Sequence, residues 1–250
     1  MNSLNARIVV LYNAKGGAGK TTTSCNLAGS LALRGFDVLV ADLDDQGSST
    51  KRIGIGVGAE NTPAIWPGHG YGAKVSVELG KLAQKYEIIV VDCAPGTEKD
   101  VNWAALMVAD LVIVPSKLEP VDLGAVAHAK RLIEKAWDDS GRKYPGFILP
   151  VEAQLHKKED LAYIEMLRKH GGSALGIVDM SVTSKNKSGK KETTEVPMTL
   201  GDRNAFTRPA LIGATAHSIP NSKLAVSELE LLTDFVLNAL AMPSNKEEML

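Results

Sequence analysis

Residues 13–23 read Asn-Ala-Lys-Gly-Gly-Ala-Gly-Lys-Thr-Thr-Thr and decide the fold class. Residues 7–12, before them, form an apolar run that predicts a buried strand, and residues 22–34, after them, carry apolar side chains at helical spacing. A strand, a glycine-rich turn, a lysine, a hydroxyl and a helix are the layout of a phosphate-binding loop. The glycines let backbone N–H groups turn toward phosphate oxygens, and the start of the helix adds partial positive charge.

The side chains of this stretch have separate expected tasks. Lys20 is expected to neutralise the β- and γ-phosphate oxygens, the Thr21 hydroxyl to ligate Mg²⁺, and Thr22 to reach the α-phosphate. The backbone N–H donors would come from the residues between the two lysines, which are Gly16, Gly17, Ala18 and Gly19. The stretch therefore predicts a site for a nucleoside triphosphate and its magnesium ion.

The loop departs from the plain pattern G-x-x-x-x-G-K-[ST]. Ala14 stands where the first glycine is expected, and a second lysine, Lys15, opens the loop. The form K-G-G-x-G-K-T-T resembles the deviant Walker A motif of the ParA/MinD family of P-loop ATPases. The resemblance covers residues 6–135 well and residues 200–240 loosely, where residues 220–229 are similar to the end of short, plasmid-type ParA proteins. It implies an ATPase that uses ATP and Mg²⁺.

Further apolar patterns predict the rest of the fold. Four runs are typical of buried strands: 36–41, 87–91, 111–114 and 146–149. Helical patterns lie between and beyond them, at 74–85, 100–108, 121–137, 158–169, 202–210 and 221–240. This alternation predicts an α/β fold of the P-loop NTPase kind: a doubly wound, mostly parallel sheet with helices on both faces.

The remaining segments predict one domain with an irregular connection. We expect a single P-loop ATPase domain, residues 1–250, with core motifs in 7–135, a C-terminal part in 145–240 and a polar tail in 243–250. Residues 46–73 hold many glycines and are expected to form a long irregular loop with at most a short helix. A strand is predicted at 175–182, and residues 184–192 are expected to form a polar, basic loop.

Two predicted strands end in carboxylates. Ligands of such sheets lie beyond the carboxyl ends of the strands, so these side chains are expected beside the phosphates. In the family that the chain resembles, the second aspartate of Asp-x-Asp orients the attacking water; this implies that role for Asp44 and a structural one for Asp42. Many members continue with proline, and Asp45 in its place predicts a looser turn. Asp92 ends strand 87–91 as a Walker B carboxylate does, and is expected to hold Mg²⁺ through water.

Lys15 separates this family from other P-loop proteins. The resemblance implies that it crosses a dimer interface and touches the phosphates of the partner subunit's ATP. Two copies would then share bound ATP, so ATP would stabilise a homodimer. The expected catalytic residues are Lys15, Lys20 and Asp44, and the expected metal site consists of Thr21, Asp44 and Asp92.

Two further sites follow from the resemblance. In relatives the loop at the position of Pro220 lies near the adenine, which makes Pro220 a candidate nucleotide contact. ParA proteins bind non-specific DNA through basic patches, and such contact with phosphates is salt-sensitive. The densest basic cluster and two arginines supply the candidates Lys185, Lys187, Lys190, Lys191, Arg203 and Arg208.

The bulk composition limits other classes of function. A net charge of −1 gives no global signal for nucleic acid, so DNA contact requires a local patch. The chain shows no secretion pattern and no long apolar window, and its tail is polar, which predicts a cytoplasmic protein without membrane anchoring. Cys25 and Cys93 are expected to be reduced, buried thiols, and no histidine or cysteine spacing indicates a metal besides Mg²⁺.

These expectations together predict a ParA-like ATPase for plasmid or chromosome partition. ATP would drive dimerisation and binding to nucleoid DNA, slow hydrolysis would reset the cycle, and a ParB-like centromere-binding protein would stimulate it. Three alternatives stay open: a MinD-like positioning protein, a metabolic or cluster-assembly ATPase, and a nucleotide-gated scaffold for conjugation or transport that does not act on DNA directly.

Overall fold

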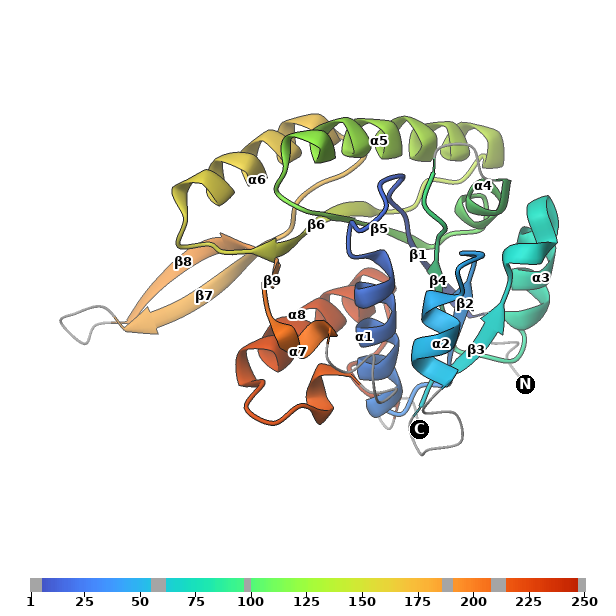
Figure 1. Ribbon diagram of the computed structural model, residues 1–250, viewed down its shortest axis with the longest axis horizontal. Coiled ribbons are helices and arrows are strands. Elements are labelled where there is room, and N and C mark those ends of the chain that lie inside the picture. Colours follow the sequence, from blue (N-terminus) through green and yellow to red (C-terminus); the bar gives the residue numbers. More distant parts are fainter. Residues whose placement is uncertain (1–5, 55–61, 97–99, 186–190, 208–214, 247–250) are drawn as a thin grey trace.

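Figure 1 shows a computed structural model of the chain, which describes residues 6–54, 62–96, 100–185, 191–207 and 215–246. A seven-stranded sheet has the order β3-β2-β4-β1-β5-β6-β9, and each neighbouring pair is parallel. Its strands are β1 (Arg7–Leu11), β2 (Val38–Asp42), β3 (Ala64–Pro67), β4 (Ile88–Asp92), β5 (Leu111–Ser116), β6 (Gly146–Ala153) and β9 (Leu200–Gly201). The predicted parallel α/β sheet is confirmed.

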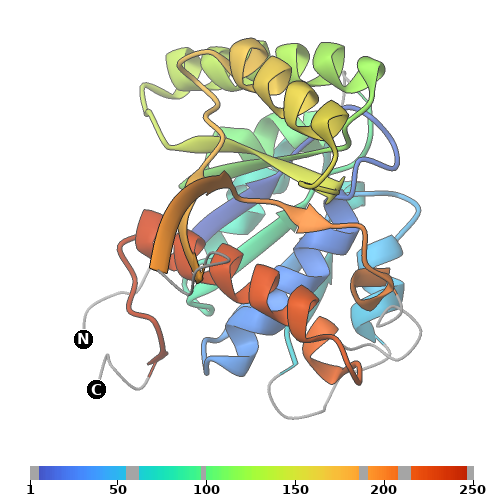
Figure 2. The same ribbon diagram turned by 90° about the vertical axis from the view of Figure 1, so that its left-hand side faces the viewer.

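Helices cover both faces of this sheet (Figures 1 and 2). One face packs against α3 (Val75–Leu82), α4 (Asp100–Leu106), α5 (Pro120–Ser140) and α6 (Lys158–Gly171). The other packs against α1 (Lys20–Leu33), α2 (Ser48–Gly54), α7 (Asn204–Thr207) and α8 (Lys223–Ala239). The described part also has two 3-10 helices, His69–Lys74 and Ala216–Ser218. None of the helices in the described part is both long enough and apolar enough to cross a membrane.

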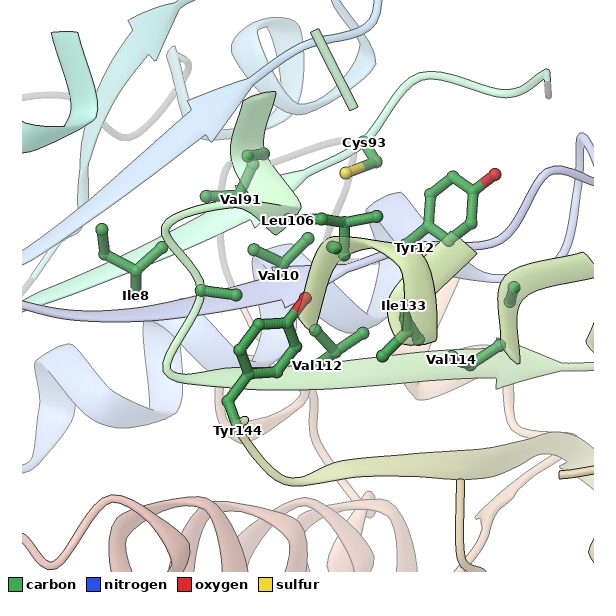
Figure 3. Packing of buried hydrophobic residues seen from close by; sticks show 14 of the residues in the cluster. Ile8, Val10, Tyr12, Val91, Cys93, Leu106, Val112, Val114, Ile133 and Tyr144 are labelled. Carbon is green, nitrogen blue, oxygen red and sulfur yellow. The ribbon is translucent and has the colours of Figure 1, made fainter. Parts of the chain in front are cut away.

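The central strand β1 shows why the strands of this sheet have continuous apolar sequences. Side chains alternate along a strand, and Figure 3 shows Ile8, Val10 and Tyr12 on the face that Ile133 of α5 covers. The intervening Val9 is also fully buried, in the core on the side of α1. Fully burying one large aliphatic side chain contributes about 1.5–3 kcal/mol, so the middle of a strand covered on both faces favours apolar residues at every position. Both cysteines are buried and form no disulfide, as predicted.

The expectation of an irregular loop over residues 46–73 was wrong in part. The structure places α2, the strand β3 and a 3-10 helix in this region. Strand β3 has four residues, lies at the sheet edge and pairs with β2 from Leu39–Ala64 to Asp42–Pro67. Such a short strand ending in proline carries no alternating pattern, because its backbone pairing with β2 rather than its own side chains defines it. The two-residue β9 was missed for the same reason.

The basic loop expected at 184–192 was also partly wrong. Strand β7 (Asp179–Lys185) runs further than predicted, and β8 (Lys191–Pro197) returns antiparallel to it. Together they form a hairpin that projects from the body of the molecule (Figure 1). Its sequence is rich in Ser, Thr, Lys and Glu, so it lacks the apolar alternation by which a half-buried strand is recognised.

Candidate active site

The loop between β1 and α1 is shaped by two glycines at the carboxyl edge of the sheet. Gly17 and Gly19 have φ angles of 72° and 90°, a region that favours glycine. Gly19 precedes the 14-residue α1, and no side chain caps this end of the helix. The first N–H groups of α1 therefore face the loop without a side-chain acceptor, and the positive end of the helix favours an anion there.

Lys20 begins α1 and is buried within the loop, with 6% of its surface exposed. Its ammonium group donates to the backbone oxygen of Lys15 at 3.1 Å, so it folds back over the loop. Burial lowers the pKa of Lys20, while the charges of Asp92 and Asp44 act in the opposite direction. The structure thus brings these two aspartates into electrostatic contact with the loop lysine.

Asp92, at the end of β4, is fully buried and surrounded by hydroxyl groups. It accepts hydrogen bonds from Thr21 Oγ1 at 2.7 Å, Ser49 Oγ at 2.5 Å and Ser24 Oγ at 3.3 Å. Burial raises the pKa of Asp92 to about 6, although the hydrogen bonds from Ser49 and Thr21 oppose this shift. A carboxylate beside a threonine hydroxyl is a hard oxygen donor set that fits Mg²⁺. The rest of its ligand shell would be water and phosphate, because no group of three or more His, Cys, Asp or Glu in the described residues is arranged to hold a metal.

The Asp-x-Asp turn after β2 gives its two carboxylates different surroundings. Asp42 is buried and accepts from the backbone N–H and the hydroxyl of Thr50, both at 2.8 Å, which ties α2 to the sheet. Asp44 is half-buried; its N–H donates to Asp42 at 3.2 Å and its carboxylate accepts from Gln46 N–H at 3.1 Å. These bonds hold the turn in which Asp45 stands at the position of the family's proline.

Lys15 is held by its own chain. Its ammonium group contacts Glu119 Oε2 at 2.7 Å and Asp122 Oδ2 at 3.0 Å, at the start of α5. The Asp122 side chain is fully buried, and its second oxygen, Oδ1, has no hydrogen-bond partner. Burial lowers the pKa of Lys15, but the hydrogen bonds to both carboxylates outweigh it and the pKa is raised. Burial also raises the pKa of Asp122, more than Lys15 lowers it.

A cavity of about 230 Å³ opens beside the phosphate loop. It shares Gly19 and Thr22 with the loop, and its other lining residues are Thr23, Val151, Glu152, Leu200, Gly201, Asp202, Arg203, Asn204, Phe206 and Thr207. Val151 packs directly on the loop, because a Cβ on Gly19 would lie 3.1 Å from it. The cavity therefore begins where the phosphate loop ends, with walls from β6, β9 and α7.

Two buried polar residues hold the α7 wall of this cavity. Asn26 of α1 donates to the backbone oxygen of Phe206 at 3.1 Å and accepts from Ala216 N–H at 2.9 Å. Arg52 of α2 donates to the same oxygen of Phe206 at 2.8 Å. Burial lowers the pKa of Arg52. The helix that follows the Asp-x-Asp turn is thus joined to the cavity wall through one carbonyl group.

The other predicted contacts lie apart from the loop. Pro220 is exposed and does not line the cavity; the residues after it, 221–225, line a second cavity with residues 202–205. Lys185 and Lys191 stand opposite each other at the end of the hairpin, whereas Lys187, Lys190 and Arg208 lie outside the described residues. Arg203 is not part of the hairpin: its guanidinium donates to Glu228 of α8 at 3.0 Å.

Several residues of the site were not predicted from the sequence. Ser49 could have been found as a hydroxyl at a helix start, five residues after Asp44, and Asp122 as an acidic residue in the first turn of the helix predicted at 121–137. Glu152 had only a weak signal, an acidic residue next to an apolar run. No local pattern distinguishes these side chains from solvated ones, because their partners are distant in the chain.

Comparisons with known proteins agree with this geometry. A family model described as an AAA domain matches residues 6–65. The maintenance of carboxysome distribution protein A of Gloeobacter kilaueensis is 32% identical over 127 residues, 48% of this chain and 53% of that protein. The chromosome-partitioning ATPase Soj of Thermus thermophilus is 31% identical over 157 residues, 52% of this chain and 62% of that protein. The chain thus spans less than two thirds of the length of either relative.

One solved structure extends the likeness to nearly the whole chain. The ATP complex of a McdA variant from Cyanothece aligns with a TM-score of 0.71, covering 96% of this chain and 98% of that one. At 15% sequence identity this likeness shows a common fold. The C-terminal part, which gave the loosest sequence pattern, therefore follows the same architecture as the N-terminal motifs.

Proposed function

The chain belongs to the ParA/MinD family of P-loop ATPases, and on this premise we propose that it is a partition ATPase whose ATP-bound form is a homodimer that binds DNA. The observation that carries the proposal is the loop itself, with Lys15 and Lys20 at its two ends and Asp44 and Asp92 beside it. A P-loop that serves a monomer needs only one of these lysines. The second one supports ATP shared between two copies.

The residues of the loop divide the work of phosphoryl transfer to water. Backbone N–H groups at the start of α1 would hold the phosphates, and Lys20 would neutralise the oxygens that gain charge. When bound, Mg²⁺ would withdraw negative charge from the phosphates. Thr21 and Asp92 would hold it. Asp44 would orient the attacking water, which its position near Lys20 allows.

Lys15 would couple nucleotide binding to dimerisation. In the single chain it is held by Glu119 and Asp122, so it must leave both carboxylates before it can reach the phosphates of a partner. Leaving is unfavourable, because Asp122 is buried and would lose its cation. The triphosphate of a second copy would give Lys15 new anionic partners in place of the two carboxylates, which makes the dimer depend on ATP.

We place the DNA contact on the hairpin β7–β8. The backbones of Lys185 and Lys191 are direct cross-strand partners. DNA phosphates attract lysine side chains, and a two-stranded ribbon fits the major groove. The dimer would present two such hairpins. A ParB-like partner would stimulate the ATP hydrolysis that resets the cycle on the nucleoid.

Sedimentation velocity tests the proposal. The chain is run with ATP, ADP or no nucleotide, with and without non-specific duplex DNA at two salt concentrations. We expect association only with ATP, and DNA binding only by that form and only at low salt. Association without ATP, or no DNA binding at low salt, would remove the partition function.

A matched pair of variants assigns the hydrolysis step. Asp44→Ala should lose ATP turnover and keep the ATP-dependent dimer, since Asp44 is proposed to act on water. Asp139→Ala, an exposed aspartate at the end of α5, should change neither. Unchanged turnover in Asp44→Ala would favour a nucleotide-gated scaffold instead.

The likeness to carboxysome distribution protein A favours one second candidate, a positioning ATPase that does not act on DNA directly. This function needs the same loop and the same ATP-dependent dimer. It predicts that the hairpin substitution Lys191→Glu leaves every sedimentation result unchanged. The function in DNA partition predicts that this substitution weakens the DNA complex. The salt dependence of the DNA affinity should not become steeper.

A further inference from the structure

Glu152 has an unusual backbone conformation at the mouth of the cavity beside the phosphate loop. It lies in β6 with a φ of 57°, a left-handed value that residues with a side chain rarely adopt. The pairing of β6 with β9 shifts register at the same point, between Val151 and Ala153. Strained backbone persists where the surrounding structure holds it, and it is concentrated at ligand sites. This conformation places Glu152 among the residues that line the cavity.

A lysine from the neighbouring strand fixes the Glu152 carboxylate. Lys117 follows β5 directly, and its ammonium group lies 2.8 Å from Glu152 Oε2. The two side chains are 27% and 52% exposed, so the pair lies at the surface of the molecule and not in its core. A carboxylate only accepts hydrogen bonds, and the lysine leaves Oε1 for a donor. The pair therefore presents a fixed acceptor.

The rest of the cavity suits a flat ring with a hydrogen-bond donor. Val151, Leu200 and Phe206 supply apolar walls, and among the described lining residues the one cation, Arg203, is engaged by Glu228. The cavity also shares Gly19 and Thr22 with the phosphate loop. A nucleotide whose phosphates occupy the loop would therefore place its base against these walls.

We propose that Glu152 determines the base specificity of the site, its carboxylate accepting a hydrogen bond from the exocyclic amino group of adenine. This assignment rests on the proposed function, because it requires ATP in the phosphate loop. Lys117 acts as a positioning residue that holds the carboxylate. A base that turns a carbonyl oxygen toward Glu152 would be rejected, because two acceptors repel.

The test compares ATP with purine riboside 5′-triphosphate, which lacks only the amino group. Affinities are measured by calorimetry on the full chain and on Glu152→Gly, Glu152→Gln and Lys117→Met. The glycine variant suits a φ of 57°, so it is expected to fold. The matched control is Glu78→Gln, which removes another surface carboxylate paired with a lysine, on α3.

We expect the wild-type chain and Glu78→Gln to bind ATP about 10-fold more tightly than the analogue, the size of one hydrogen bond to a charged group. Glu152→Gly should bind both nucleotides equally, and Glu152→Gln should recover part of the preference through its amide oxygen. Lys117→Met should reduce the preference while the analogue binds as before.

Several results would overturn the assignment. Equal binding of ATP and the analogue by the wild-type chain would do so, as would a preference that persists in Glu152→Gly. A Glu152-dependent preference for GTP would show that the carboxylate reads a different base. If neither nucleotide binds and Lys20→Ala behaves like the wild type, the proposed function fails and the assignment fails with it.

Discussion

The phosphate side and the base side of the site are assembled in opposite ways. The phosphate side is one continuous stretch, residues 13–23, joined by aspartates at the ends of two strands. The base side combines the end of β6, the two-residue β9 and the four-residue α7, which are far apart in the sequence from the loop that they adjoin. One part of a site can therefore be formed by neighbours in the sequence, while the other part is formed by segments that only the tertiary structure brings together.

The two sides also differ in how their charges are surrounded. On the phosphate side Lys20 and Asp92 are buried, and Asp122 is buried beneath Lys15. On the base side the charged pair of Lys117 and Glu152 is partly exposed, where an ion pair contributes little. Substitutions on the phosphate side should therefore have large effects, and those on the base side small ones. Four measurements examine this difference.

The largest effect is expected from Lys20→Ala. The substitution removes a buried cation from the phosphates, and hydrogen bonds to charged groups contribute about 3 kcal/mol at most, so ATP affinity should fall about 100-fold. Calorimetric titration with ATP measures this. The control Lys81→Ala removes an exposed lysine of α3 and should bind ATP normally. An affinity within about threefold of wild type would mean that the phosphates bind elsewhere, and the contrast between the two sides of the site would no longer hold.

The second effect is a pH dependence that belongs to Asp92. Its pKa is about 6 in the folded chain against an ordinary aspartate value of 3.8, so between these pH values the folded state binds more protons than the unfolded state. The free energy of unfolding should therefore fall as pH rises through this window, by about 2–3 kcal/mol from this group. Urea unfolding measures the free energy of unfolding between pH 4 and 7. It should fall with pH in the wild type by this amount more than in Asp92→Asn. Parallel pH curves for the two proteins would contradict it.

The third effect is a loss of stability in Lys15→Ala. Removing this cation leaves the buried Asp122 carboxylate without its partner, which should lower the free energy of unfolding by about 2 kcal/mol. Urea unfolding measures it at neutral pH. The double variant Lys15→Ala/Asp122→Asn should recover most of the loss, because the unpaired charge is gone. A double variant as unstable as the single one would show that the loss has another cause.

The smallest effect is expected on the base side, from Glu152→Gly. Glycine relieves the left-handed strain but makes the unfolded chain more flexible, so stability should change by less than about 1 kcal/mol in either direction. Thermal unfolding without nucleotide measures this. A loss as large as that of Lys15→Ala would mean that both sides of the site are equally tied into the core.

The sequence was sufficient for the loop because strand, glycines, lysine and helix start follow one another within a few residues. It was not sufficient for β3 or for the hairpin β7–β8, which are defined by pairing between polar or very short segments. The same limit applied to the cavity, whose lining joins residues of α1 to Val151, Glu152 and residues between 200 and 207, and the candidate contact Pro220 is not part of this lining. Ser49 was missed because its carboxylate partner, Asp92, lies 43 positions away.

The sequence by itself determined the phosphate loop, the apolar strands around it and the two aspartates at strand ends, because each of these depends on neighbours in the chain and on a repeat of two or 3.6 residues. Only the tertiary structure decided that Lys15 contacts Asp122, and that Lys117 pairs with Glu152, which lines the cavity. Those contacts join side chains from separate strands and helices. Their distances are set by the twist and order of the sheet, which no single segment encodes.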